Sequence, residues 1–394
     1  MNGYKKIVLI APWPLFLDVY FYKDVGTFIK YLSYIYKRPA EIVMLKNFSP
    51  EFTKKNNFEG VKIVKIENTS GYEEVPKLRN IIKYSKYLKP FKYYIKENAK
   101  EMGHVMLFHL NSVTLTFTKW LTHYNKDIKI YVKGDISFFN RDSQKFLLAA
   151  LLKKGIYFSC ESKELYNKIC LKNKKYNKQI CLIPNGVDDT FALIIPHQRK
   201  DNLIISTARF GSTQKNSELL LDILANLDYK RDWQVILAGP IETEEQDFQL
   251  KIDDCFRKNP NLEKHVHFIG NVSDRNELYK LYERAKIFIF PSRWEGSSLS
   301  FIEAAYFGNY IIATDVGCAK EVLSISNYGF IAPESQTGKQ NITVIKDSMV
   351  KELQSIINGS KNIEIERENF INKIRNNYSM TRIVSNDFFK SYMQ

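Results

Sequence analysis

The chain has 394 residues, 44% of them hydrophobic and 26% charged, which is enough for two or three domains with buried cores and excludes a disordered tail. No apolar run approaches the roughly 18 to 20 residues that span a bilayer, and the N-terminal apolar stretch lacks a small-residue cleavage site. We therefore expect a soluble protein that stays in the cytoplasm. The five cysteines lack CxxC spacing and are odd in number, which favours reduced thiols over a disulfide framework or a zinc site.

Positive charge is concentrated in the first half of the sequence. Residues 1–185 hold 33 of the 58 Lys and Arg but 15 of the 43 Asp and Glu, a net +18, whereas residues 186–394 carry a net −3. A basic half favours an anionic partner, which can be nucleic acid, an acidic membrane surface or a phosphate-bearing substrate. The charge alone does not choose among the three.

Apolar runs rich in β-branched residues recur along the chain, with room for a helix between them. In the first half they lie at 7–11, 41–45, 61–66, 104–109, 128–132 and 156–160, and in the second at 203–208, 233–239, 266–270, 287–291, 310–315 and 329–333. Strands that alternate with helices predict parallel sheets covered on both faces, with ligands bound outside the carboxyl ends of the strands. Two such series predict two doubly wound α/β domains.

The polar stretch PNGVDD to PHQRKD separates the two series and predicts a linker. We expect an N-terminal domain over 1–185, the linker at 186–200 and a C-terminal domain over 201–375. A C-terminal helix over 376–394 is expected to return to the N-terminal domain. A ligand of both domains would lie in the cleft between them.

Basic and aromatic side chains alternate over residues 76–100. The basic ones are Lys77, Arg79, Lys83, Lys86, Lys89, Lys92, Lys96 and Lys100, among Tyr84, Tyr87, Phe91, Tyr93 and Tyr94. This pattern favours the headgroup region of an anionic bilayer. The alternatives are a solvated face with its aromatic residues in the core, and a surface that stacks nucleic-acid bases. Pro90 predicts two short helices, or a helix and a loop.

Polar groups stand where two predicted strands of the first half end. His109 closes VMLFH, and Lys133 with Asp135 lies in YVKGDIS. At such an edge an imidazole can bond a hydroxyl or its proton, and a carboxylate can meet an acceptor hydroxyl. The alternatives are a structural histidine and a turn built on Gly134-Asp135.

Cations follow the first strand of the second half. Arg209 and Lys215 come after LIISTA and before the apolar run LLLDIL, so they lie in a loop that leads into a helix. Arg offers a bidentate fork and Lys a point charge, which together suit a diphosphate, although ordinary loop charge is the alternative. The small-residue turn at Gly239-Pro240 could let a nucleotide approach the backbone.

The segment from Pro291 to Val322 places carboxylates at a helix N-terminus. Glu295 follows the strand IFIF, Ser297 and Ser298 are candidate caps, and Glu303 lies in the helix that Gly308 ends. Backbone N–H groups at a helix N-terminus bind anions, so the pattern suits a phosphate with neighbouring hydroxyls. The alternative is that Glu295 only interacts with the positive end of the helix dipole and that Glu303 is a solvated helix residue.

These elements, in this order, resemble glycosyltransferase family 4, the retaining glycosyltransferases with the GT-B fold. The motifs that carry the resemblance are IPNGVD at 183–188, Arg209 with Lys215, AGP at 238–240, the stretch 268–292, and Glu295-x7-Glu303 followed by TDVG at 314–317 and Glu321. The resemblance implies two Rossmann-like doubly wound domains facing a central cleft. Here the family's glycine after the lysine is Asn216, its EGFGL is EGSSL, and Cys318 follows TDVG.

The resemblance also implies roles for individual residues. Arg209 and Lys215 would hold the donor diphosphate, Glu303 the ribose hydroxyls, and the small turn the nucleotide. The donor sugar and phosphate would be held by Glu295 with the backbone of Gly296, Ser297, Ser298 and Leu299. In the first half, Gly26 is the only glycine after the first strand that can bring backbone close to a sugar-phosphate. His109 corresponds to the family's strand-end histidine.

From this resemblance we expect a retaining glycosyltransferase of the hexosyltransferase type. It would move a sugar from a UDP- or GDP-linked donor to a saccharide or lipid-linked saccharide in cell-surface polysaccharide or lipopolysaccharide biosynthesis. No metal or other cofactor is expected, and residues 76–100 would contact the inner face of the cell membrane. The alternatives are another GT-B enzyme, such as a sugar-nucleotide epimerase or a sugar-phosphate synthase, a basic nucleic-acid-binding protein, and a transferase-like scaffold that binds no donor.

Overall fold

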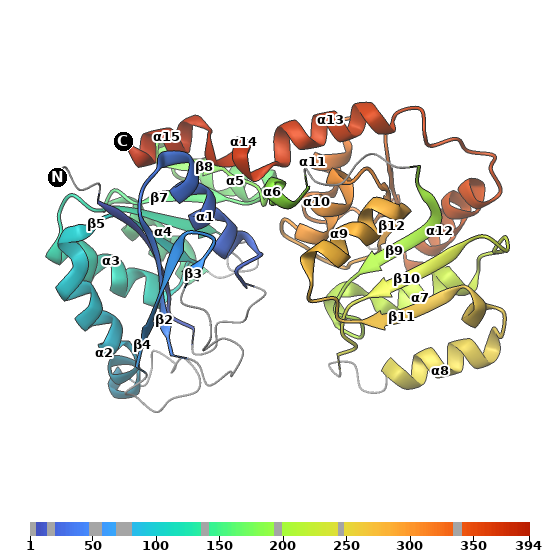
Figure 1. The fold of residues 1–394 in the computed structure, drawn as a ribbon, viewed down its shortest axis with the longest axis horizontal. Helices are drawn as coiled ribbons and strands as arrows, with labels where there is room; N and C mark the ends of the chain where they lie inside the picture. Colours follow the sequence, from blue (N-terminus) through green and yellow to red (C-terminus); the bar gives the residue numbers. More distant parts are fainter. Residues whose placement is uncertain are drawn as a thin grey trace. The chain divides into compact units, whose positions relative to one another are not determined.

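The computed structural model describes residues 5–13, 20–46, 57–67, 81–134, 142–192, 199–242, 248–333 and 341–394. It divides into two compact units (Figure 1). The first comprises Met1–Pro184 together with Met380–Gln394, and the second comprises Asn185–Ser379. Residues of the predicted linker belong to the second unit, in which Asp189–Ala192 form the short helix α6 and Asp201 begins a strand.

The first unit contains a sheet of eight strands among its described residues, ordered β3-β4-β2-β1-β5-β6-β7-β8. The strands pair in parallel except β3 with β4. Their bounds are β1 Lys6–Ala11, β2 Ala40–Leu45, β3 Asn57–Phe58, β4 Val61–Ile66, β5 Met102–Phe108, β6 Lys129–Gly134, β7 Tyr157–Cys160 and β8 Ile180–Leu182. The six predicted strands of this half are present, and the two short strands β3 and β8 were not predicted.

Both faces of this sheet are covered, as the alternation of β1 illustrates. Val8 and Ile10 join the apolar core that includes the helices between β4 and β8, while Ile7 and Leu9 join the core on the opposite face. Successive side chains of a strand point to opposite faces, so a wholly apolar strand needs helices on both. The helices are α1 Asp24–Tyr36, α2 Ile81–Asn98, α3 Ser112–Tyr124, α4 Asp142–Leu152 and α5 Lys163–Cys170, with short 3₁₀ turns η3 Ala99–Glu101 and η5 Lys174–Tyr176.

The C-terminal segment completes the second of these cores. Helices α14 (Met380–Val384) and α15 (Asp387–Met393) lie beside the first unit in Figure 1. Phe389 and Tyr392 are fully buried with Phe28 and Tyr131, and the Tyr392 hydroxyl donates to the carbonyl oxygen of Val105 at 3.2 Å. The end of the chain is therefore part of the first unit's core.

Helix α2 corrects the expected break at Pro90. The helix runs without interruption from Ile81 to Asn98, with Pro90 buried inside it. Tyr87 and Phe91, on either side of the proline, are fully buried against the sheet. Most helical stability in proteins comes from such tertiary packing, which here outweighs the hydrogen bond that proline removes.

The second unit has a parallel sheet ordered β11-β10-β9-β12-β13-β14 in its described part. The strands are β9 Asp201–Thr207, β10 Gln234–Ala238, β11 Val266–Gly270, β12 Ala285–Phe290, β13 Tyr310–Ala313 and β14 Phe330–Ile331, all of them predicted. The helices are α7 Ser217–Ala225, α8 Phe248–Lys258, α9 Arg275–Arg284, α10 Leu299–Tyr306, α11 Ala319–Leu323, α12 Ile342–Ile357 and α13 Arg367–Tyr378, with 3₁₀ turns η6 Thr213–Lys215 and η7 Leu262–Lys264.

Each sheet has a point where the strand order reverses direction. In the first unit β1 lies between β2 and β5, and in the second unit β9 lies between β10 and β12. Loops that leave adjacent strands in opposite directions at such a point open a crevice at the carboxyl edge, which is where doubly wound folds bind ligands. Of the polar residues predicted from the sequence, Arg209 follows β9, Glu295 follows β12 and His109 follows β5, each beside one of these two points.

Candidate functional site

Arg209 follows the central strand β9 and is anchored by a neighbouring loop. The backbone N–H of Phe210 donates to the Pro240 oxygen at 2.9 Å, so the loops after β9 and β10 run together. A Cβ on Gly239, whose φ is 149°, would lie 1.8 Å from the Ala208 oxygen, so this close approach requires glycine. The guanidinium of Arg209 lies 3.2 Å from Glu242 and remains half exposed.

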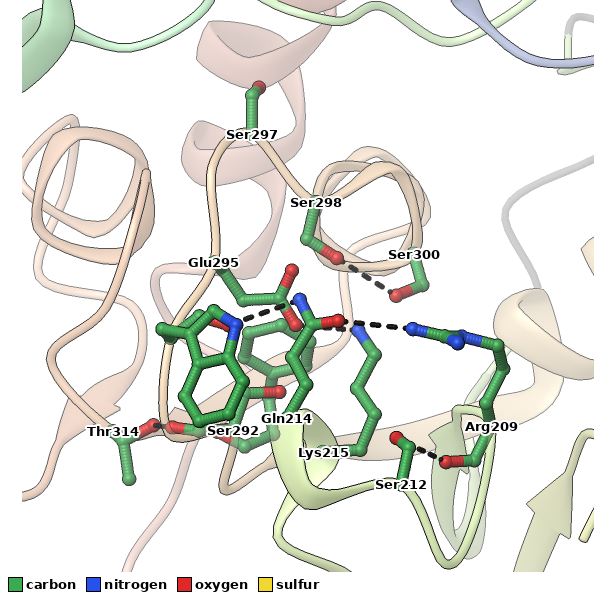
Figure 2. A network of polar contacts seen from close by, with 12 residues as sticks. Arg209, Ser212, Gln214, Lys215, Ser292, Glu295, Ser297, Ser298, Ser300 and Thr314 are labelled. Carbon is green, nitrogen blue, oxygen red and sulfur yellow. Dashed lines mark hydrogen bonds and ion pairs between the residues drawn. The ribbon is translucent and has the colours of Figure 1, made fainter. Parts of the chain in front are cut away.

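Lys215 lies beside Glu295 at the adjacent strand end. Its Nζ is 2.6 Å from the Glu295 Oε1 and 5.2 Å from the centre of the Phe290 ring, and both charged side chains are largely buried. Figure 2 shows the lysine and the carboxylate pointing toward each other from the loops after β9 and β12. The two predicted charges are therefore one ion pair in this structure.

Gln214 links this pair to Arg209, a connection that the sequence analysis missed. Its Oε1 accepts a hydrogen bond from the Arg209 Nη2 at 3.0 Å, and its Nε2 donates to the Trp294 oxygen at 3.2 Å (Figure 2). A glutamine between two charged residues in a loop carries no sequence signal of its own. Its amide holds the arginine against the loop that carries Glu295.

Asn216 occupies the position where the resembled family has glycine. Its φ of 54° is in the left-handed region, which asparagine tolerates better than other residues with a side chain. Its Nδ2 donates to the Pro291 oxygen at 3.2 Å, at the end of β12. The substitution thus keeps the backbone turn and adds a bond between the loops of Lys215 and Glu295.

The loop between Glu295 and α10 is fixed from two sides. Asn185, from the IPNGVD motif, donates its Nδ2 to the Ser297 oxygen at 2.6 Å and its backbone N–H to the Ser297 hydroxyl at 3.3 Å. A Cβ on Gly317, the glycine of TDVG, would lie 2.2 Å from the Gly296 oxygen. Three separate motifs of the resemblance therefore meet at one loop.

The predicted serine caps differ in detail from the structure. Ser298 is the N-cap residue of α10, but its side chain bonds the Ser300 hydroxyl at 3.1 Å instead of capping the helix. Figure 2 shows Ser297 pointing away from the Lys215–Glu295 pair. The N-terminus of α10, which begins at Leu299, thus has no side-chain cap, and uncapped backbone N–H groups of this kind can bind an anion.

Glu303 is a buried ion-paired residue rather than a solvated one. Its carboxylate contacts the Arg275 guanidinium at the start of α9, and only 4% of its side chain is exposed. Arg275 also donates to the Tyr279 hydroxyl at 3.2 Å. Burial lowers the pKa of Arg275, but the charge of Glu303 and the contacts with Tyr279 together outweigh burial, so this pKa lies above its ordinary value. Arg275 was not among the residues predicted from the sequence.

In the first unit, His109 and Lys133 lie at the carboxyl edge with an acidic residue that was also missed. The Lys133 Nζ is fully buried, 3.0 Å from the Asp24 Oδ2 and 4.8 Å from the centre of the Phe28 ring. Burial raises the pKa of the Asp24 carboxyl, but the electrostatic interactions with Lys133 and His109, together with hydrogen bonds from Lys133 and the Val25 N–H, outweigh burial and hold it below its usual value. Asp24 begins α1, the helix that follows β1 at the switch point.

Two other predicted residues of the first unit have different outcomes. Gly26 lies in α1, where an added Cβ would be 2.3 Å from the Phe21 oxygen, so its missing side chain makes room for the preceding backbone. That contact explains the glycine without a ligand, and its predicted role in binding remains a prediction. Asp135 lies outside the described residues.

The described ranges contain neither a cluster of metal ligands nor a membrane-spanning helix. No group of three or more His, Cys, Asp or Glu side chains within these ranges is placed to hold a metal ion. None of the helices in the same ranges is long and apolar enough to cross a membrane.

The second unit matches a known family of enzymes. Residues 189–375 match the family model "Glycosyl transferases group 1". The match covers nearly all of the second unit, and it confirms the predicted resemblance at the level of group 1. The narrower assignment to family 4 stays a prediction.

Curated relatives share parts of the sequence. The chain is 30% identical over 112 residues to the lipopolysaccharide core biosynthesis mannosyltransferase LpsB of Rhizobium meliloti (strain 1021), covering 28% of this chain and 31% of that protein. It is 32% identical over 151 residues to the MMP alpha-(1->4)-mannosyltransferase of Mycolicibacterium hassiacum, covering 37% and 34%. The chain thus spans about a third of the length of these relatives.

Solved structures resemble the whole chain. Sucrose-phosphate synthase from Thermosynechococcus elongatus has a TM-score of 0.67 at 16% identity, covering 96% of both chains. The lipopolysaccharide outer core galactosyltransferase WaaB has a TM-score of 0.67 at 16% identity, covering 98% of this chain and 99% of that one. The Anabaena protein HepE in complex with UDP-glucose has a TM-score of 0.66 at 12% identity, covering 98% of each. These likenesses show the fold, which is GT-B as predicted.

Proposed function

We propose that this protein is a retaining glycosyltransferase. It transfers a hexose from a UDP- or GDP-linked donor to a hydroxyl of a saccharide or lipid-linked saccharide. The donor binds to the second unit, and the acceptor to the first. The family match of residues 189–375 and the mannosyltransferase relatives support the reaction class. The relative named for lipopolysaccharide core biosynthesis supports a role in assembling a cell-surface polysaccharide.

The observation that carries the proposal is the convergence of Arg209, Lys215 and Glu295 at the switch point of the second sheet. The two cations lie after β9 and the carboxylate after β12, joined through the 2.6 Å ion pair and the Gln214 amide. Sugar transfer breaks the bond between the anomeric carbon and a diphosphate oxygen, and negative charge grows on the diphosphate. Cations and helix N–H groups directed at this charge stabilise the transition state more than the bound donor.

Retention follows from attack on the face that the diphosphate leaves. The acceptor oxygen bonds the anomeric carbon as the carbon–phosphate oxygen bond breaks, and the departing phosphate oxygen takes the acceptor's proton. This route needs no enzymic nucleophile, unlike the paired carboxylates of retaining glycosidases. The protein's own groups neutralise the leaving diphosphate, so we propose that no divalent metal ion is needed.

The lysines of α2 support a peripheral membrane contact for the same enzyme, at the inner face of the cell membrane. Lys83, Lys86, Lys89 and Lys92 are exposed, whereas Tyr84, Tyr87 and Phe91 are buried in the core. Only Tyr93 among the ring residues of this stretch is more than half exposed in the described part. The buried rings match the alternative of a solvated lysine face with its aromatic residues in the core, so the membrane contact proposed here is electrostatic.

Calorimetric titration tests the donor site. UDP, GDP, CMP and ADP are titrated in EDTA into the wild type, Glu303→Ala and the control Glu368→Ala, whose side chain is exposed on α13. We expect one diphosphate to bind the wild type and the control, with binding lost in Glu303→Ala. Added Mg²⁺ should leave the affinity unchanged. Absence of binding by every nucleotide would overturn the assignment.

The nucleotide that binds then selects the sugars to screen. The product is analysed by NMR for a new glycosidic bond whose anomeric configuration equals that of the donor. An inverted product would contradict the retaining route. An isomerised nucleotide sugar without a new bond would instead indicate an epimerase.

A further inference from the structure

The Arg275–Glu303 pair is largely shielded from water. Glu303 is 4% exposed and Arg275 17% exposed, and the guanidinium also lies 4.8 Å from the centre of the Tyr279 ring. Taking two charges out of water costs several kcal/mol per ion by general experience, and a buried pair often adds little net stability. A gain in net stability is therefore a weak explanation for the presence of this pair.

The helices that carry the pair pack against each other through apolar contacts. The rings of Tyr279 and Phe307 lie 5.0 Å apart, and Tyr282 stacks against Phe307 at 6.2 Å. All three rings are buried in the core of the second unit. These contacts already join α9 to the end of α10, so the ion pair is not required to hold the two helices together.

The pair lies near the carboxyl edge of the sheet, where doubly wound folds bind ligands. Arg275 begins α9, shortly after the carboxyl end of β11, and Asp274 caps that helix by accepting from the Asn276 N–H at 2.8 Å. Tyr282, on the same helix as Arg275, shares a hydrogen bond of 2.7 Å with Thr207, the last residue of β9. Glu303 lies in α10, the helix that follows β12, and β12 pairs with β9. Both members of the pair are therefore carried by helices that start at the carboxyl edge of the sheet, where we propose that the diphosphate binds.

We propose that Arg275 is a positioning residue that holds the Glu303 carboxylate ionised and oriented for the ribose hydroxyls of the donor. This inference rests on the proposed function. An ionised carboxylate accepts hydrogen bonds from hydroxyls more strongly than a neutral group does, and a fixed one loses little entropy on binding. Arg275 thus acts on the donor through Glu303, without touching the reacting atoms.

A comparison of ribose with 2′-deoxyribose nucleotides tests this role. UDP and dUDP, and GDP and dGDP, are titrated calorimetrically into the wild type, Arg275→Met, Arg275→Lys and Tyr279→Phe. Arg284→Met is the matched control, because Arg284 ends the same helix α9 and its side chain is 59% exposed beside Asp201. Thermal melting of each variant measures stability separately.

A carboxylate placed for the 2′-hydroxyl should make the wild type prefer the ribonucleotide by ~10-fold or more. Arg275→Met should reduce the preference to within about 2-fold by weakening the ribonucleotide, since the deoxynucleotide lacks the bond in both proteins. Arg275→Lys and Tyr279→Phe should fall between these limits, and the control should match the wild type. If Arg275→Met does not fold, the two milder variants decide the question.

The outcomes separate this inference from the proposed function. If the wild type binds no nucleoside diphosphate, the donor site itself is overturned. The wild type can instead bind a ribonucleotide while Arg275→Met keeps the full ribose preference. The donor site then stands and the positioning role is wrong. If Arg275→Met does not fold, the same conclusion is drawn from Arg275→Lys and Tyr279→Phe. A fall in melting temperature with an unchanged preference would show that the pair only joins α9 to α10. Equal wild-type binding of both sugars would also overturn the inference.

Discussion

The Lys215 ammonium and the Glu295 carboxylate lie 2.6 Å apart although 80 residues separate them in the sequence. The partner carboxylate holds the lysine at the carboxyl edge of β9 and balances its charge while no phosphate is bound. Under the proposed function, a doubly negative diphosphate would compete for the same ammonium, and we expect the pair to act as a preformed receptor for the leaving group.

Removal of this ammonium should impair turnover more than binding. We expect Lys215→Ala to lower kcat by about 100-fold with a smaller change in KM, because the charge acts most strongly on the diphosphate as it leaves. Lys215→Arg should restore part of the loss. Steady-state kinetics with the donor measures both constants. Lys251→Ala, which removes an exposed pair with Glu218 on the same unit, is the control, and an unchanged kcat in Lys215→Ala would contradict this role.

The Asp24–Lys133 pair should matter for the stability of the first unit. Lys133→Met leaves the largely buried Asp24 carboxylate without its main counter-charge, so we expect a loss of about 3 to 5 kcal/mol in the free energy of unfolding. The double variant Asp24→Asn, Lys133→Met should lose less than the single one, because no uncompensated charge remains. Urea denaturation measures each value. Lys168→Met breaks an exposed pair with Glu164 and should cost below about 1 kcal/mol.

Lys200 should make stability depend on pH. Its Nζ donates to the backbone oxygens of Tyr282 at 2.9 Å and Phe307 at 2.7 Å, and burial, with the charge of Arg367, lowers the pKa of Lys200 from 10.5 to about 7. At a pH between these two pKa values, Lys200 is protonated in the unfolded chain and neutral in the folded chain. Stability therefore rises as the pH increases from about 7 toward 10.5.

The measurement compares the wild type with Lys200→Met. We expect the wild type to gain up to ~1.4 kcal/mol per pH unit relative to the variant above neutral pH. Urea denaturation at pH 7.5 and pH 9 gives the two differences. A difference between the proteins that does not change with pH would show that the lysine stays charged in the folded state.

The exposed lysines of α2 should control binding to anionic vesicles. Replacing Lys86, Lys89 and Lys92 by Gln should weaken binding by about 100-fold, at ~1 kcal/mol per lysine. Co-sedimentation with vesicles of neutral lipid and with vesicles containing an anionic lipid measures it, and added salt should abolish binding. The control replaces three exposed lysines of the second unit, Lys258, Lys264 and Lys280. Binding that survives high salt would contradict an electrostatic contact.

The sheets were predictable because their strands are apolar on both faces. A run such as residues 203–208 has no polar alternation and must be covered on two sides, which fixes a parallel α/β fold. The short strands β3 and β8 were missed because two or three residues carry no periodic signal. The continuous helix through Pro90 was missed because local preference says nothing of the packing of Tyr87 and Phe91.

The site was predictable only in part, for a similar reason. The charged residues Arg209, Lys215 and Glu295 stand at strand ends, a position that sequence patterns reveal. Other charged residues of the two sites do not stand at strand ends. Arg275 and Asp24 each begin a helix, and the ion pairs that they form, with Glu303 and Lys133, depend on side chains that only the fold brings near. The only sequence signal for Asp24 was an acidic residue in the first turn of the helix that follows β1, and such residues are also typical of ordinary helix starts.

The return of the C-terminal segment to the first unit has a consequence for how the protein is made. The second unit holds its whole core within Asn185–Ser379, and near its two ends the Val187 N–H donates to the Tyr378 oxygen at 2.8 Å. During synthesis it can fold as soon as it emerges. Most of the first unit is translated earlier, but its core includes Phe389 and Tyr392. We therefore expect the first unit to complete its folding after the second, once these residues have been synthesised.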